Sequence, residues 1–165
     1  MRHYSTAALA VSLLAGSLLS TGASAADPAP KPPYWASIRP SVARMRTGPA
    51  RTYPASWLYR RAGLPLKVVA TFKEWRKVED QDGASGWMQG NLLSMTRTAV
   101  VTAGPPLDLR ERPAANGRLA YRAAPGVVGK LSECAGGWCR FDVMGQAGYA
   151  QVEGLWGVEP GERIP

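Results

Sequence analysis

Hydrophobic and polar positions alternate over short stretches of this chain, and no stretch after residue 25 keeps a period of 3.6 residues. In SVARMR (41–46), Ala43 and Met45 fall on one face and Arg44 and Arg46 on the other, as in a half-buried strand. Similar stretches follow at short intervals: WLYRR (57–61), LKVVATF (66–72), WRKVED (75–80) and SGWMQ (85–89). Five short strands in about 60 residues predict a small, strongly curved barrel.

Turn signals separate these expected strands. The long loop TGPARTYPAS (47–56) follows the first of them, and a tight bend is expected at Lys73-Glu74. Asp82-Gly83 is typical of a hairpin turn, and GNLL (90–93) fits a single 3₁₀ turn that closes the unit. The pattern therefore predicts an all-β fold.

The same pattern occurs twice. Trp75 matches Trp138 at an offset of 63 residues, and with one-residue gaps RMRTGP (44–49) aligns with DLRERP (108–113) and Gly86-Trp87 with Gly148-Tyr149. Each match is short, but their order along the two halves is the same, which indicates two copies of one unit. We place these units at residues 38–98 and 99–165.

The first 25 residues resemble a secretory signal. A short basic start precedes the apolar run ALAVSLLAGSLL (8–19), and ASA (23–25) predicts cleavage between Ala25 and Ala26. The run is short for a membrane span, so we expect an exported protein, periplasmic or secreted, with no stable membrane span after cleavage. The alternative is an anchor that stays attached. Residues 26–37, which begin ADPAPKPP, are expected to form a Pro-rich tether.

Export changes the chemistry that is available. His3 is the only histidine and would leave with the signal, which excludes Ser-His and Cys-His pairs and most catalytic zinc sites. The acidic cluster Glu79, Asp80 and Asp82 flanks a hairpin turn, where carboxylates are usually solvated turn formers. We therefore expect no enzymatic activity, no catalytic residues, no metal and no cofactor.

The charge is unevenly distributed between the two units. Residues 34–98 hold 11 Lys+Arg and 4 Asp+Glu, whereas residues 99–165 hold 7 of each. This asymmetry is typical of a first unit that meets an anionic partner, and the alternative is a cationic surface that only keeps the protein soluble. Nucleic acid is disfavoured as the partner, because an exported protein rarely meets it.

Residues 46–94, RTGPARTYPASWLYRRAGLPLKVVATFKEWRKVEDQDGASGWMQGNLLS, resemble the bacterial SH3-like (SH3b) domain of exported proteobacterial proteins that carry two such domains in tandem. ERPAANGR, GGWCRF and LWGVEPGE in the second half resemble that group's second domain, including its cysteine pair. The resemblance implies two tandem SH3-like barrels. Related domains bind peptidoglycan peptides or position hydrolases at the cell wall. Tyr149-Ala150 departs from Trp87-Met88 of the first copy, so an aromatic-dependent site there would be weaker.

Aromatic residues and arginines interleave in the first unit, where they could form stacking and carboxylate-binding surfaces. Ligand grooves on SH3-like barrels usually lie beside the long loop, which Tyr53 and Trp57 flank. Core burial is favoured for Trp75, whereas core and binding roles stay equally open for Trp87. The expected ligand-binding residues are Tyr53 and Trp57, with Tyr59, Arg51 and Trp87 as further candidates.

Cys134 and Cys139 are the only cysteines, and four residues separate them. Redox catalysis usually uses C-x-x-C, and structural zinc needs four ligands, so a disulfide is the expected role. In a barrel, the two cysteines would face each other across a hairpin, and an oxidising compartment would keep the bond. The first copy has Thr71 and Arg76 at these positions, so the fold itself does not require the bridge.

Two functions from different classes remain. The first is a wall-binding module whose basic, aromatic groove holds peptidoglycan peptide stems, which carry free carboxylates. The second is an adaptor that binds an extended or Pro-rich segment of an envelope protein. An enzyme is the third and least favoured interpretation.

Overall fold

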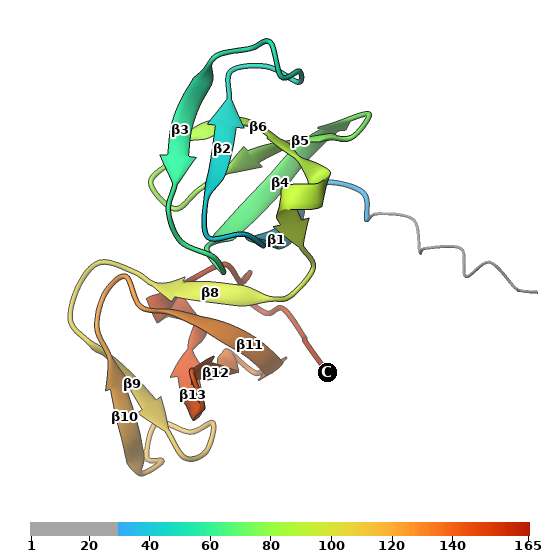
Figure 1. Ribbon diagram of the computed structural model, residues 1–165. Helices are drawn as coiled ribbons and strands as arrows, with labels where there is room; N and C mark the ends of the chain where they lie inside the picture. The colour runs from blue at the N-terminus through green and yellow to red at the C-terminus, as the bar shows by residue number, and fades with distance from the viewer. Residues whose placement is uncertain (1–29) are drawn as a thin grey trace, which may run out of the picture.

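The computed structural model describes residues 30–165, which form two β-domains with the same order of elements (Figure 1). The first domain contains β1 (Tyr34–Ile38), β2 (Ala43–Arg46), β3 (Ala55–Tyr59), β4 (Pro65–Phe72), β5 (Trp75–Glu79), β6 (Ser85–Gln89), the 3₁₀ turn η1 (Gly90–Leu92) and β7 (Leu93–Ser94). The second contains β8 (Thr98–Val101), β9 (Leu107–Arg110), β10 (Leu119–Ala123), β11 (Val128–Ala135), β12 (Trp138–Val143), β13 (Gln146–Gln151), η2 (Val152–Gly154) and β14 (Leu155–Trp156).

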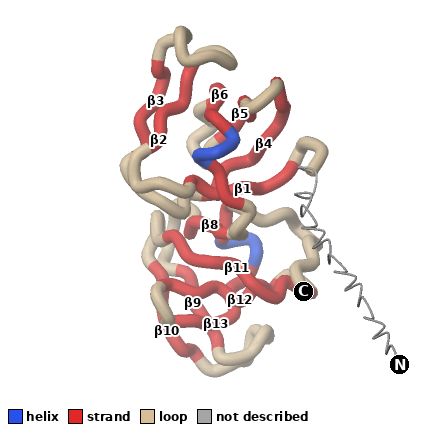
Figure 2. The backbone as a smooth tube through the Cα atoms, turned by 45° about the vertical axis from the view of Figure 1, so that its right-hand side comes forward, coloured by secondary structure: helices blue, strands red, loops and turns tan. Residues whose placement is uncertain are grey.

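Each domain is one curved antiparallel sheet of seven strands. The strand orders are β3-β2-β6-β5-β4-β1-β7 and β10-β9-β13-β12-β11-β8-β14, so every strand of the first sheet has a counterpart seven strands later. Figure 2 shows the single 3₁₀ turn of each domain in blue, directly before the short last strand. The predicted all-β class and the predicted two copies of one unit are confirmed.

One boundary predicted from the sequence is wrong. Residues 34–37, expected in the tether, belong to β1, which pairs with β4 from Tyr34↔Val68 to Ser37↔Pro65. Residues 35–38 are all buried, and a strand buried on both faces lacks the alternation that marks a half-buried one. Thr98 likewise already belongs to β8. The expected signal and its cleavage site, Ala25 and Ala26, lie outside the described residues.

The two cores are built from equivalent strands. The first consists of the buried residues Ala36, Ile38, Ala43, Met45, Tyr59, Leu66, Val68, Val78, Met88 and Leu93. A glycine at the same place in both copies lets β6 and β13 cross closely over β2 and β9. A Cβ at Gly86 would lie 2.6 Å from Met45 Cγ, and a Cβ at Gly148 would lie 2.8 Å from Leu109 Cβ.

Cys134 and Cys139 form a disulfide between β11 and β12, with their Cα atoms 4.1 Å apart. The turn between these strands is Gly136-Gly137, whose φ angles of 59° and 81° lie in the left-handed region that glycine adopts freely. The equivalent pair in the first domain is Thr71↔Arg76, as the repeat predicts. The disulfide is thus an addition to the second copy of the fold.

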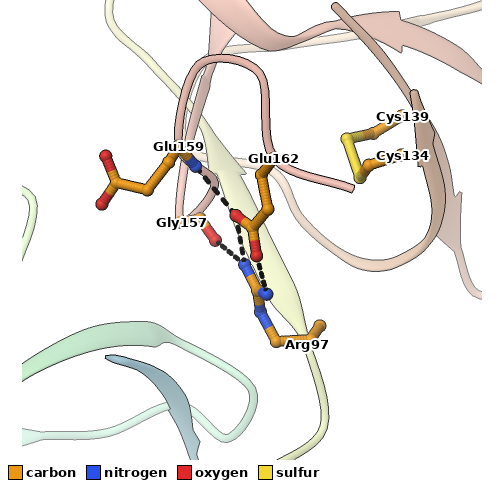
Figure 3. Close-up of a disulfide and its surroundings, with 6 residues drawn as sticks. All are labelled: Arg97, Cys134, Cys139, Gly157, Glu159 and Glu162. Carbon is orange, nitrogen blue, oxygen red and sulfur yellow. Dashed lines mark hydrogen bonds and ion pairs between the residues drawn. A yellow bond between two sulfur atoms is a disulfide. The ribbon is translucent and has the colours of Figure 1, made fainter. Parts of the chain in front are cut away.

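The C-terminal segment folds back beside this disulfide (Figure 3). Ile164 exchanges two backbone hydrogen bonds with Cys134. Glu162 forms a bidentate ion pair with Arg97, which lies between β7 and β8, and Arg97 Nη2 also donates to the carbonyl oxygen of Gly157 at 2.9 Å. Burial alone would raise the pKa of Glu162, but hydrogen bonds from Arg97 and the Glu159 N–H, with the charge of Arg97, hold that pKa below its usual range.

Side chains of both domains meet at one interface. The indole rings of Trp35 and Trp156 pack edge to face with their centroids 4.8 Å apart. Lys67 Nζ lies 5.4 Å from the Trp35 ring centroid and 2.8 Å from Glu159 Oε1 of the second domain. These contacts stabilise one orientation of the two domains. Within residues 30–165 no helix has the length and apolar character needed to cross a membrane.

Candidate functional site

A pocket of about 290 Å³ opens on the first domain beside the loop that joins β2 and β3. We call it the basic pocket, because three of its eight lining residues are arginines and none is acidic. Its lining residues are Val42, Ala43, Arg44, Arg46, Arg51, Trp75, Gln89 and Leu92.

The alternation of β2 aims two of these arginines outward. Ala43 and Met45 are buried, whereas Arg44 is exposed and Arg46 is half-buried on the other face, as predicted. Arg46 Nη1 donates a hydrogen bond of 2.7 Å to the carbonyl oxygen of Tyr53, which ties the guanidinium to the long loop. Arg51, from the same loop, reaches Gln89 Oε1 at 3.4 Å. The pocket is therefore partly preorganised by its own side chains.

Trp75 supplies the aromatic part of the basic pocket. It is the first residue of β5, directly after the tight bend in which Lys73 has a φ of 48°. Its side chain is only 3% exposed, which confirms the expected core burial, yet it lines the pocket as well. The indole N–H donates to Glu74 Oε1 at 3.2 Å, so the orientation of the ring is fixed.

The arginines of the basic pocket lack carboxylate partners. Among residues 30–165, the ion pairs are Lys67–Glu159, Arg97–Glu162, Arg110–Asp108, Arg118–Glu111 and Arg122–Asp108, and none of them includes a residue of the basic pocket. An unpaired guanidinium offers a planar set of N–H donors that matches a carboxylate or phosphate. The pocket is thus chemically suited to an anionic group.

On the equivalent face of the second domain, an aspartate pairs with two arginines. Arg46 pairs with Trp87 across β2 and β6, and Arg110 pairs with Tyr149 across β9 and β13, so the two arginines are equivalent. Two residues earlier, the first domain has Arg44 and the second has Asp108. Asp108 Oδ2 lies 3.0 Å from Arg110 Nη2 and its Oδ1 lies 3.0 Å from Arg122 Nε.

The residues that the sequence singled out lie in more than one place. Arg51 lines the basic pocket. Tyr53 is 46% exposed and its ring lies over the backbone of Gly48, where an added Cβ would come within 2.5 Å of it. Trp57, which is 54% exposed, and Tyr59 line a separate cavity of about 240 Å³ that also includes Trp156 of the second domain. The structure does not bring these five candidates into one site.

Tyr59 is held by the turn that follows β5. Its hydroxyl donates to Asp80 Oδ2 at 2.8 Å, and Asp80 Oδ1 accepts the backbone N–H groups of Asp82 and Ala84. Burial, followed by the bond to Asp80, raises the pKa of Tyr59 far above its usual value, so the phenol stays neutral. This arrangement makes Tyr59 part of the turn rather than a free contact for a ligand.

Trp87 is half-buried on β6 and is paired with Arg46 and Lys77, next to Gln89 of the basic pocket. The ligand-binding residues expected from the sequence did not include Arg44, Arg46 or Gln89. Two signals could have found the arginines: the alternation in SVARMR puts both on one outward face, and the repeat sets Arg44 against an aspartate.

Comparison with protein families identifies the fold. The model of the bacterial SH3 domain matches residues 39–94 and, a second time, residues 103–157. The chain belongs to the bacterial SH3 domain family. The first match covers β2 to β7 and the second covers β9 to β14, which is six of the seven strands of each sheet. The predicted tandem of SH3-like domains is thus confirmed. Bacterial SH3 domains are generally binding modules, and they commonly bind cell-wall components.

Solved structures with similar portions include two proteins from Trichomonas vaginalis. NlpC2 matches with 11% identity and a TM-score of 0.34, and the match covers 78% of this chain and 49% of NlpC2. NlpC1 matches with 10% identity and a TM-score of 0.35, and the match covers 78% of this chain and 47% of NlpC1. An NlpC/P60 family protein from Bacillus cereus ATCC 10987 matches with 13% identity and a TM-score of 0.34, and the match covers 79% of this chain and 57% of that protein. The match spans about half the length of these proteins. No curated protein matches the chain.

Proposed function

We propose that this protein is a non-catalytic binding module of the cell envelope that holds peptidoglycan through the free carboxylates of its peptide stems, in the basic pocket of the first domain. The observation that carries the proposal is the set of Arg44, Arg46 and Arg51 around one pocket without a carboxylate partner. The same face of the second domain carries an internal ion pair instead.

Each part of the basic pocket has a role in this proposal. Arg44 and Arg46 stand two residues apart on β2, so both guanidinium groups face outward and can receive carboxylates with paired hydrogen bonds. Arg51 approaches from the loop, and Gln89 adds an amide that can donate or accept. Val42, which is 51% exposed, offers an apolar surface to the aliphatic part of a peptide.

The family and the expected export support the same location. Bacterial SH3 domains are typically extracellular or associated with the cell wall. A signal over residues 1–25, cleaved between Ala25 and Ala26, would deliver the protein to the periplasm or to the outside of the cell, where peptidoglycan is accessible. The proposed role is non-enzymatic and uses no cofactor.

A second candidate is an adaptor that binds an extended, acidic or Pro-rich segment of an envelope protein. The apolar residues Val42 and Leu92 favour it, because they line the basic pocket beside the arginines and could receive a proline ring. The two candidates share the pocket and differ in the partner.

Cosedimentation with purified peptidoglycan sacculi separates the two candidates. We expect the protein to pellet with sacculi at low salt and to be released as salt rises, because the contacts of the basic pocket are ionic and exposed. A protein that stays in the supernatant at low salt would rule out the wall-binding function and leave the adaptor.

A further inference from the structure

A larger cavity lies where the two domains meet. Its volume is about 640 Å³, and it is lined by the β3–β4 loop, the segment that joins β7 to β8, the start of β11 and the β12–β13 turn. We call it the seam cavity. Its charged lining residues are Arg39 and Arg61 of the first domain and Lys130 and Asp142 of the second.

Two of the cations are fixed by main-chain carbonyl groups. Arg39 Nη2 donates to the carbonyl oxygen of Leu93 at 2.9 Å, and Arg61 Nη1 donates to the carbonyl oxygen of Gly126 in the second domain at 2.9 Å. A guanidinium has five N–H donors, so each arginine keeps several for a ligand. Preorganised donors of this kind lower the entropic cost of binding.

The remaining charges leave the seam cavity positive. Lys130 is exposed on β11, and none of the ion pairs among residues 30–165 includes it. Asp142 is the one carboxylate in the lining, and its Oδ1 accepts the backbone N–H of Gly145 at 2.7 Å. Three cations and one carboxylate give a lining charge that a dianion would balance.

We propose that the seam cavity binds a phosphomonoester dianion carried on a sugar-sized group. A phosphomonoester has a charge of roughly −1.5 to −2 at neutral pH and three acceptor oxygens, which matches the three cations Arg39, Arg61 and Lys130. The volume lies inside the range of about 300–1,000 Å³ typical of ligand pockets and far exceeds a bare phosphate. Because both domains contribute, the site exists only in the tandem.

Calorimetric titration with glycerol 3-phosphate tests this site, with succinate as a dicarboxylate of similar charge. We expect binding of glycerol 3-phosphate and a loss of about tenfold in affinity in Lys130→Gln. Lys77→Gln removes the same charge from an exposed position that lines none of the described cavities, and it should bind like the parent protein.

Amide chemical shifts locate the bound probe, and we expect the largest changes at Thr98 and Gly129. Absence of binding, or unchanged affinity in Lys130→Gln, would overturn the site. Succinate bound as tightly as glycerol 3-phosphate would overturn the phosphate assignment. Arg44→Asp alters only the basic pocket and should leave the affinity for glycerol 3-phosphate unchanged. This titration therefore tests the seam cavity independently of the proposed wall binding.

Discussion

Asp108 Oδ2 lies 3.0 Å from Arg110 Nη2 in the second domain, at the two positions that Arg44 and Arg46 hold in the first. The two copies of one fold thus carry opposite charges at the first of these positions, an arginine in the first domain and an aspartate in the second. In the first copy that face is cationic and lines a pocket, and in the second it is internally paired. The duplication keeps the scaffold and changes the charge of one face.

Replacing Tyr59 with phenylalanine removes the hydroxyl that donates to Asp80 and leaves this carboxylate with two backbone donors. We expect the free energy of unfolding of the first domain to fall by about 1 kcal/mol, measured by urea denaturation. Tyr53→Phe is the matched control, because no hydrogen bond through the Tyr53 hydroxyl is seen among the described residues, and it should change the value by less than about 0.5 kcal/mol. Equal effects of the two substitutions would contradict the role given to Tyr59.

Reduction of the Cys134–Cys139 disulfide should destabilise the second domain alone. The loop that it closes is short, so chain entropy predicts a loss of about 2 kcal/mol, equivalent to roughly 10 °C in the melting temperature of a domain of this size. Calorimetry with and without reductant measures this shift, and binding by the first domain should persist. Ready labelling of both cysteines by a thiol reagent in the untreated native protein would contradict the disulfide.

The ion pair between Glu162 and Arg97 should make stability depend on acid pH. Because the pKa of Glu162 is lowered in the folded protein, its contribution is complete above the unfolded pKa, about 4.3, and is lost as the pH falls through the lower folded value. We expect Glu162→Gln to be less stable than the parent at pH 7 and the difference to vanish in stronger acid. Glu153→Gln, at an exposed residue of η2, is the control. A difference that stays constant down to the acid limit would rule out the pair as its source.

Trp156→Ala should free the two domains from one another. The substitution removes the edge-to-face contact with Trp35, a type of pair worth about 0.5–1.5 kcal/mol beyond its buried area. We expect ¹⁵N relaxation to show shorter rotational correlation times for both domains. Tyr121→Ala, at an exposed residue of β10, should leave the tumbling of the tandem unchanged, and the same result for Trp156→Ala would contradict the interface.

The repeat made most of the fold predictable, because alternation, turn residues and matched positions agree in both copies. The disulfide followed from the same alignment, since Thr71 and Arg76 do pair where the cysteines do. β1 was missed because both of its faces are buried, one in its own core and one through Trp35 against Trp156, so its sequence shows no alternation.

The candidate site was only partly predictable. Alternation in SVARMR aimed Arg44 and Arg46 outward, and the loop position of Arg51 suggested contact with a ligand. Exposure of Trp57 was expected, but its cavity is completed by Trp156 of the other domain, and no local pattern reveals how two domains dock. Trp75 shows that burial and a place in a pocket lining are compatible for a large ring.

In the proposed function, the unpaired arginines of the first domain bind the carboxylates of peptidoglycan stems. Calorimetric titration with purified soluble muropeptides tests this binding most directly. The titration compares the parent protein with Arg44→Asp, which copies the second domain. The control is Arg112→Asp, which makes the same charge change at an exposed loop residue of the second domain. We predict that Arg44→Asp loses at least about tenfold in affinity, whereas Arg112→Asp binds like the parent. Equal affinities of Arg44→Asp and the parent protein would contradict the claim.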